Sequence, residues 1–183
     1  MSKCRAWYEG DPILEEYHDY EWCKISHDDR FQFEMLCLEG ASVGLSWKTI
    51  MHKRMNYKAA FHDFDIDTCA AMTDEELENL LSNTGLIRNR GKIFSVRKNA
   101  QVVKKIQEEY GSFDSYLWMF RNGNVIDRHW KDITEIPTES DVSRRMSADM
   151  KERGICYAGP VITYSFLQAI GIVNDHLEGC RYR

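Results

Sequence analysis

Residues 141–171 give the clearest indication of the fold class, and their sequence is DVSRRMSADMKERGICYAGPVITYSFLQAIG. Ser140 precedes it as a helix N-cap, and Gly154 stands where a helix would end in a glycine. Five residues later, Gly159 and Pro160 mark a second start, because proline fits the first position of a helix. The stretch therefore predicts a helix, a short glycine-containing hairpin and a second helix.

Helical signals also dominate on either side of this stretch. An aspartate N-cap before proline, a capping box at Thr73 and apolar residues at helical spacing recur along the chain. They predict further helices over residues 12–22, 29 to the glycines at 40 or 44, 47–61, 74–84, 90–110 and 116–120. Residues 121–139 are expected to form a long loop or a strand pair, with a turn at Asn122-Gly123. The sequence thus predicts an all-α fold.

Length and composition indicate a single domain, residues 1–183, with a sizeable core. The chain is 43% hydrophobic and 29% charged, close to globular averages. No apolar run approaches the ~20 residues of a membrane span, and Met1 to Arg5 lack the apolar stretch of a signal peptide. We therefore expect a cytoplasmic protein with no membrane partner. In that compartment its six cysteines are thiols or metal ligands rather than disulfides.

Charge is distributed unevenly along the chain. The net charge is −5, which by itself argues against a nucleic-acid partner. Residues 79–107, however, contain no acid and carry seven bases, among them Arg88, Arg90 and Lys92. Residues 40–62 are also free of acids. A locally basic face on an acidic body can still hold a polyanion.

Two His/Cys pairs near the chain ends form a candidate metal site. His176 and Cys180 are four residues apart, the spacing of one helical face, and Cys4 and His18 form a second pair. Two cysteines and two histidines make a closed tetrahedral zinc set, which is typical of structural sites. The spacing matches no local zinc-finger pattern, so exposed terminal thiols are the alternative interpretation.

Glu39 lies in an apolar run that ends at Trp47, where a carboxylate is costly unless it is paired or functional. Trp47, Trp7, Trp22 and Tyr17 offer flat faces suited to a base or a cation. The alternative is a tryptophan-rich core with a solvent-facing glutamate. Similarly, the hairpin before Pro160 either grips phosphate with its backbone N–H groups or is an ordinary corner between two helices.

Four blocks of these residues resemble the DNA-3-methyladenine glycosylase I family. The blocks are Cys4…Trp7…Asp11-Pro12…Tyr17-His18-Asp19…Glu21-Trp22, Leu38-Glu39-Gly40…Gly44-Leu45-Ser46-Trp47, Arg88-Asn89-Arg90-Gly91-Lys92, and Tyr164-Ser165-Phe166…Val173-Asn174-Asp175-His176…Cys180. The likeness keeps their order and approximate spacing over essentially the whole chain. It implies a compact helix-hairpin-helix glycosylase fold and the excision of 3-methyladenine from alkylated double-stranded DNA, with 3-methylguanine as a second candidate substrate.

The resemblance also assigns site residues, one by one. It implies one structural Zn²⁺ per chain that joins the termini, residues 4–18 and 176–180, through Cys4, His18, His176 and Cys180. It makes Glu39 the catalytic residue and Tyr17 and Trp47 the base pocket, with Trp7 and Trp22 nearby. Leu45 is implied as a wedge in the DNA, and the expected DNA-binding residues are Gly44, Leu45, Arg88, Arg90, Lys92 and Gly159.

The sequence departs from the family pattern at a few positions. Cys23 stands where glycine is expected, and Leu14 where some relatives have an aromatic ring. The family is part of the helix-hairpin-helix DNA glycosylase superfamily, many members of which carry a catalytic aspartate. That aspartate aligns with Asn174 or, after a one-residue shift, with Asp175. A missing acid fits the substrate, because a base alkylated at N3 is already cationic and leaves as a neutral molecule.

Two other functions remain open at this point. The first is a bifunctional glycosylase/lyase, which would use a lysine nucleophile, and Lys92 is the candidate. The second is a zinc-stabilised protein that binds DNA structures without catalysing a reaction. Release of free base from methylated DNA distinguishes these from a monofunctional glycosylase. No obligate protein partner is expected, and a monomer is the default.

Overall fold

The computed structural model describes Cys4 and residues 7–183. The prediction that the chain has no signal peptide rested on residues 1–5, and all of these except Cys4 lie outside the described residues. The described part of the chain contains ten α-helices, two short strands and little other regular structure. The elements are α1 (Pro12–Tyr20), α2 (Asp29–Ser42), α3 (Trp47–Met51), α4 (Arg54–Ala60), η2 (His62–Phe64), α5 (Ile66–Ala71), α6 (Asp74–Leu80), α7 (Arg90–Tyr110), α8 (Phe113–Met119), β1 (Ile126–Asp127), η3 (Ile133–Glu135), α9 (Asp141–Arg153), α10 (Pro160–Ala169) and β2 (Val173–Asn174). The prediction of an all-α fold is confirmed.

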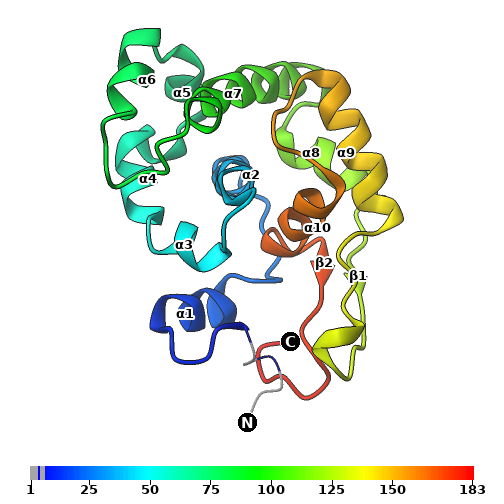
Figure 1. Cartoon of the computed structure of the whole chain (residues 1–183). Helices are drawn as coiled ribbons and strands as arrows, with labels where there is room; N and C mark the ends of the chain where they lie inside the picture. Colours follow the sequence, from blue (N-terminus) through cyan, green and yellow to red (C-terminus); the bar gives the residue numbers. More distant parts are fainter. Residues whose placement is uncertain (1–3, 5–6) are drawn as a thin grey trace.

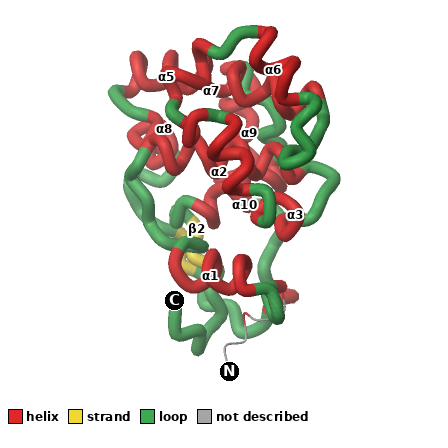
Figure 2. The backbone as a smooth tube through the Cα atoms, turned by 90° about the vertical axis from the view of Figure 1, so that its left-hand side faces the viewer, coloured by secondary structure: helices red, strands yellow, loops and turns green. Residues whose placement is uncertain are grey.

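Helix α2 lies at the centre of the molecule, where Figure 1 shows it end-on. All eleven residues from Gln32 to Ser42 are buried, which is typical of a helix surrounded by others on every side. Helices α5 to α7 cover one end of the molecule, α10 packs against α2, and α9 packs against α10. Helix α1 and the C-terminal segment lie together at the opposite end, in both Figure 1 and Figure 2. The two ends of the sequence thus meet on one side of α2.

The helix-hairpin-helix prediction is confirmed at its boundaries. The Ser140 hydroxyl accepts a hydrogen bond from the Ser143 N–H, and the Ser143 hydroxyl accepts one from the Ser140 N–H, so the two form a capping box at the start of α9. Gly154 ends that helix with φ +101°, a left-handed conformation that costs glycine little. Pro160 occupies the first turn of α10.

Several predicted boundaries are wrong in detail. The helix expected over residues 47–61 is two helices, α3 and α4, separated at His52 and Lys53. The helix expected to reach Gly85 ends at Leu80, and α1 ends before Trp22. The aromatic helix begins at Phe113, because the Ser112 hydroxyl caps it three residues earlier than expected. Helix α5 was not predicted.

The segment 121–139 is mainly loop, as one of the two expectations stated, but it contains no internal strand pair. Its strand β1 instead pairs in parallel with β2 near the C-terminus, in the register Ile126 to Val173. This pairing fixes the segment against the chain that follows α10. No described helix is long and apolar enough to cross a membrane.

Candidate active site

One cavity of about 420 Å³ brings together Glu39, the expected catalytic residue, and the four aromatic side chains expected in or near the base pocket. We call it the aromatic cavity. Its walls come from α1, α2, α3, α10 and the segment around η3. The lining residues are Trp7, Tyr17, Trp22, Glu39, Ser42, Trp47, Ile133, Ile136, Pro137, Thr138, Val161, Ile162, Tyr164, Ser165 and Gln168.

Glu39 lies in the last turn of α2 and only 5% of it is exposed. Among the described residues, no side chain donates a hydrogen bond to its carboxylate. Burial raises the pKa of the Glu39 carboxyl to about 8. The negative end of the α2 dipole also disfavours an anion at this position. A solvent-facing glutamate, the alternative interpretation of the sequence, is therefore wrong, and a cationic ligand in the cavity would favour the ionised carboxylate.

The aromatic side chains form two contacting pairs around the cavity. The rings of Tyr17 and Trp47 are 5.6 Å apart between centroids and tilted by 56°, and those of Trp7 and Trp22 are 5.3 Å apart and nearly edge-to-face. Trp7 also contacts Tyr17 at 6.4 Å, which joins the pairs. Burial raises the pKa of the Tyr17 phenol, and the nearby Glu39 carboxylate raises it further, so Tyr17 is a neutral phenol.

Ten of the fifteen lining residues were not predicted as site residues. Val161, Ser165 and Gln168 are spaced by four and three residues, so they share the face of α10 turned toward the cavity. That face was recognisable in the sequence from its helical spacing. The contribution of the η3 segment could not be recognised in the sequence, because it depends on the β1–β2 pairing. Leu14 is buried but does not line the cavity, so the departure from the family at Leu14 leaves its walls unchanged.

Asp175 does not line the cavity, but it accepts hydrogen bonds from two residues that do, Tyr164 and Gln168. Its carboxylate is fully buried and accepts three hydrogen bonds, from Trp130 Nε1 at 2.7 Å, the Tyr164 hydroxyl at 2.6 Å and Gln168 Nε2 at 2.7 Å. Asn174 accepts a hydrogen bond from the backbone N–H of His176. Neither residue lines the aromatic cavity, whose only described carboxylate is that of Glu39.

A turn over residues 43–46 presents apolar side chains beside the cavity. Gly44 has φ +75°, which allows the reversal between Ser42 and Trp47, both of which line the cavity. Leu45 is 43% exposed, as a side chain that enters DNA must be. The Lys92 ammonium donates hydrogen bonds to the carbonyl oxygens of Ala41 and Val43 and so holds this turn from α7.

Three of the seven bases in the segment 79–107 pair with acids of the preceding helices. Arg90 pairs with Glu78, Arg97 with Asp74, and Lys104 with Asp67. Arg88 is exposed and has no carboxylate within 4.0 Å among the described residues. The segment is therefore less basic in the folded protein than its sequence indicates.

Gly159, the remaining residue assigned to DNA binding, is the N-cap of α10 and has no side chain to occupy the first N–H groups of that helix. Val161 and Ile162, in the same first turn, line the aromatic cavity. The end of the hairpin and the mouth of the cavity are therefore neighbours.

The four predicted metal ligands converge at the end of the molecule where α1 meets the C-terminal segment. Their ligand atoms all lie within 4.8 Å of one another, and Cys4, His18, His176 and Cys180 are all buried. The Sγ atom of Cys180 lies 3.5 Å from His176 Nδ1 and 3.8 Å from His18 Nε2. Exposed terminal thiols, the alternative interpretation, are therefore wrong, and the cluster can hold a metal ion.

The second ring nitrogen of each histidine is oriented by a hydrogen bond. Nδ1 of His18 lies 2.8 Å from the Asp19 carboxylate, and Nε2 of His176 lies 3.1 Å from the carbonyl oxygen of Trp22. With Nδ1 of His18 and Nε2 of His176 protonated, the nitrogens that face the cluster are free to bind a cation. Metal-binding histidines typically have such partners.

Comparisons with known proteins identify relatives of this chain. DNA-3-methyladenine glycosylase 1 of Escherichia coli K12 is 41% identical over 98% of this chain and 96% of its own length. DNA-3-methyladenine glycosylase of Haemophilus influenzae is 37% identical with the same coverages.

Solved structures of high similarity share the fold. The crystal structure of a 3-methyladenine DNA glycosylase I superposes with a TM-score of 0.93 at 43% identity, over 96% of this chain and 97% of that one. A tyrosine-to-phenylalanine variant of such an enzyme in complex with 3-methyladenine gives 0.96 at 34% identity, over 100% and 97%. The sequence model of the methyladenine glycosylase family matches residues 7–183, and the chain therefore belongs to that family.

Proposed function

We propose that this protein excises 3-methyladenine from alkylated double-stranded DNA by hydrolysing the N-glycosidic bond. The observation that carries the proposal is the single cavity that places a buried carboxylate, Glu39, among four aromatic side chains. The curated relatives are named for this activity, and one related structure holds 3-methyladenine.

The cavity requires the base to leave the helical stack before it can bind. Extruding a nucleotide costs a few kcal/mol, and less for a damaged base that pairs poorly. Stacking on Trp47 and Tyr17 returns about 1–3 kcal/mol. We propose that Leu45, which is exposed on the turn beside the cavity, fills the gap that the extruded base leaves in the duplex.

Glu39 supplies the electrostatic part of recognition. In the nucleotide, 3-methyladenine carries a positive charge, which stabilises the ionised Glu39 carboxylate that burial otherwise disfavours. Neutral adenine offers no such compensation, so the same carboxylate selects against the undamaged base. By the same argument, 3-methylguanine is a second candidate substrate, because its nucleotide is also cationic.

The chemistry needs no general acid. The bond from C1′ to N9 breaks with its electron pair moving to the cationic base, which leaves neutral, while water adds at C1′ and releases one proton to solvent. The absence of Asp175 and Asn174 from the cavity lining fits this reaction. The aromatic walls exclude bulk water and hold the base in the geometry for departure.

We further propose that the four-residue cluster binds one structural Zn²⁺. Two thiolates and two imidazoles are the donors that zinc prefers, and four protein ligands leave no open coordination position for water. When bound, the ion would join α1 to the C-terminal segment through Cys4, His18, His176 and Cys180. Trp22 contacts His176, with ring centroids 4.8 Å apart, so the cluster also supports one wall of the aromatic cavity.

A single assay tests the proposed activity. DNA treated with a methylating agent is incubated with the purified protein, and released bases are separated by chromatography. We expect free 3-methyladenine and an abasic strand that stays intact until treated with alkali. Binding of the DNA without release would indicate the non-catalytic alternative, and strand cleavage without alkali would indicate a lyase.

A further inference from the structure

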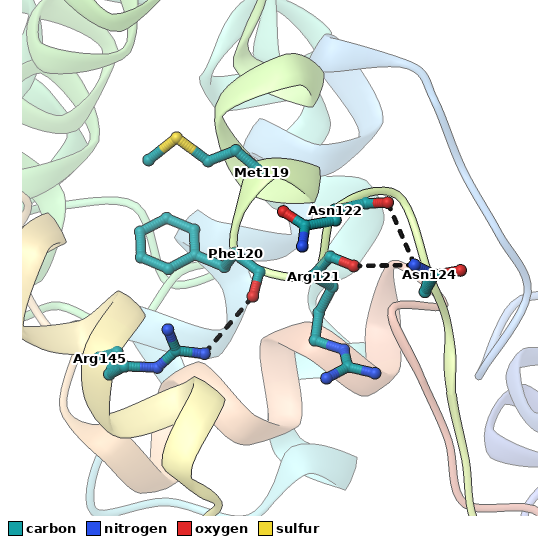
Figure 3. Close-up of a pocket in the computed structure, with 6 residues that line it drawn as sticks. All are labelled: Met119, Phe120, Arg121, Asn122, Asn124 and Arg145. Atoms are coloured by element: carbon teal, nitrogen blue, oxygen red, sulfur yellow. Dashed lines mark hydrogen bonds between the residues drawn. The ribbon is translucent and has the colours of Figure 1, made fainter.

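Two adjoining cavities, of about 510 and 570 Å³, meet at Arg121 and Arg145, which line both. They lie between the end of α8, β1 and the first turns of α9, in the loop segment to which the sequence assigned no role. Figure 3 shows the first cavity, with both guanidinium groups on the same side of the turn formed by residues 119–124. We call the two together the arginine cavities.

These guanidinium groups differ from most others in the molecule. Arg54, Arg90, Arg97, Arg144 and Arg153 each pair with a carboxylate. Among the described residues, no carboxylate lies within 4.0 Å of Arg121 or Arg145. Within Cys4 and residues 7–183, the buried Nε atom of Arg121 has no hydrogen-bond partner, and Arg145 donates a single long hydrogen bond of 3.5 Å, to the carbonyl oxygen of Phe120.

The charge in the arginine cavities is therefore positive. Arg128 lines the second cavity as well, with its guanidinium 6.0 Å from the centroid of the Trp130 ring and no carboxylate partner in the part of the chain that the structure describes. Two acids, Asp127 and Asp141, also line it, but each is engaged elsewhere: Asp127 by Arg183 and Asp141 by Arg144. A buried guanidinium nitrogen without an acceptor is costly, and an anion bound there would remove that cost.

The arginine cavities lie close along the chain to the aromatic cavity. Thr138 lines the aromatic cavity and Ser140 lines the second arginine cavity. Two residues of extended chain span at most about 7 Å. An anion near Ser140 is therefore a short distance from the segment that walls the proposed base site.

We propose that Arg121 and Arg145 bind a phosphate diester of the DNA strand that flanks the lesion, with Arg128 at the edge of the site. This proposal rests on the proposed function, because it assigns a second contact with the same DNA. The planar guanidinium matches two phosphate oxygens, and Nε of Arg121 gains the acceptor that the protein does not supply. The contact would position the strand while Glu39 and the aromatic cavity read the base.

The test is the salt dependence of binding to a duplex that contains a non-cleavable abasic-site analogue. Each lost phosphate contact flattens the slope of log K against log salt by about 0.9. Because both arginines contact one phosphate, we expect the slope of Arg121→Gln/Arg145→Gln to be flatter by about 0.9. Between 50 and 200 mM salt, the decline in affinity should then be about 3-fold smaller than for the parent.

A charge-matched control is Arg30→Gln/Lys104→Gln, whose side chains already pair with Asp63 and Asp67. We expect it to keep the parental slope. A double variant of Arg121 and Arg145 that melts at the parental temperature but has the same slope as this control would overturn the proposal. The parent's release of 3-methyladenine is assayed separately, so a failure of the proposed function would be seen there.

A second measurement distinguishes DNA phosphate from a free anion. Inorganic phosphate is titrated into the parent and the double variant by calorimetry, without DNA. Millimolar binding that the double variant loses, together with a flattened DNA slope, supports the assignment. Phosphate binding that the double variant loses while the DNA slope stays parental would identify a free-anion site and reject the DNA contact.

Discussion

The Lys92 ammonium lies 2.6 Å from the carbonyl oxygen of Val43, just before the exposed Leu45, and 2.8 Å from that of Ala41. These two carbonyl oxygens lie at the end of α2, where no N–H group of the helix donates to them. The charged Lys92 side chain of α7 supplies the missing hydrogen bonds. Partial burial lowers the pKa of the ammonium, but Lys92 is absent from the lining of the aromatic cavity. The lysine holds the 43–46 turn and does not line the aromatic cavity.

Lys92→Met should therefore destabilise the protein without removing a nucleophile. Losing two charge-assisted hydrogen bonds to backbone costs roughly 1–3 kcal/mol, measured by denaturant unfolding. Lys98→Met, which changes an exposed lysine on the same helix, is the control and should be neutral. Borohydride treatment of the parent with methylated DNA should trap no covalent adduct. An adduct that disappears in Lys92→Met would restore the lyase interpretation.

Removing a ligand of the proposed zinc site should lower the melting temperature markedly. The closed cluster joins residues that are up to 176 positions apart in the chain, so its loss frees both ends of the fold. Cys180→Ser should lose most of the bound zinc, about one ion per chain in the parent by elemental analysis. Cys156→Ser, a half-buried cysteine outside the cluster, should keep both zinc and melting temperature. Parent protein without zinc would contradict the assignment.

The parts of the fold that the sequence predicts correctly depend on local chemistry. Ser140, Gly154 and Pro160 act through hydrogen bonds and backbone angles within a few residues of themselves, so α9, the hairpin and α10 could be recognised. The short helix α5 was missed, although Asp65 caps it, because six residues carry too little periodic signal.

Features that depend on distant contacts could not be predicted in this way. The pairing of Ile126 with Val173 joins residues 47 positions apart and brings the η3 segment to the aromatic cavity. The basic run 79–107 was overestimated because its acidic partners, such as Glu78 and Asp74, lie just outside it in sequence. The residues alone offered the four-ligand cluster as one of two interpretations, and the family resemblance was needed to choose it, since the spacing matches no local zinc-finger pattern.

Asp175→Asn should weaken the fold more than it weakens catalysis. The carboxylate accepts hydrogen bonds from three donors, and a carboxamide would direct its own N–H groups at one of them. We expect a loss of about 1–3 kcal/mol of unfolding free energy. Single-turnover excision at saturating protein should fall less than tenfold, because Asp175 does not line the cavity. A loss of a thousandfold or more in a folded variant would instead mark it as the superfamily acid.

Replacing Glu39 should change how stability depends on pH. The unfolded carboxyl ionises near its ordinary pKa of 4.5, and the folded one near 8. Between these pH values the unfolded state binds fewer protons than the folded state, so the free energy of unfolding of the parent falls as pH rises. Above pH 8 the parent carries the full cost of burying an ionised carboxylate. Relative to the parent, Glu39→Gln should gain up to about 1.4 kcal/mol per pH unit across this window. Glu16→Gln, an exposed residue of α1, should show no such trend.

The same variant should lose excision while keeping DNA binding. Glu39→Gln preserves the size of the side chain but removes the charge that compensates the cationic base in the aromatic cavity. We expect the single-turnover release of 3-methyladenine to fall by roughly ten- to a thousandfold, equivalent to about 1.4–4 kcal/mol. Affinity for undamaged duplex should hardly change, because phosphate contacts lie elsewhere. Parental excision by a folded Glu39→Gln protein would mean that stacking and shape alone select the lesion, and that the buried carboxylate has another purpose.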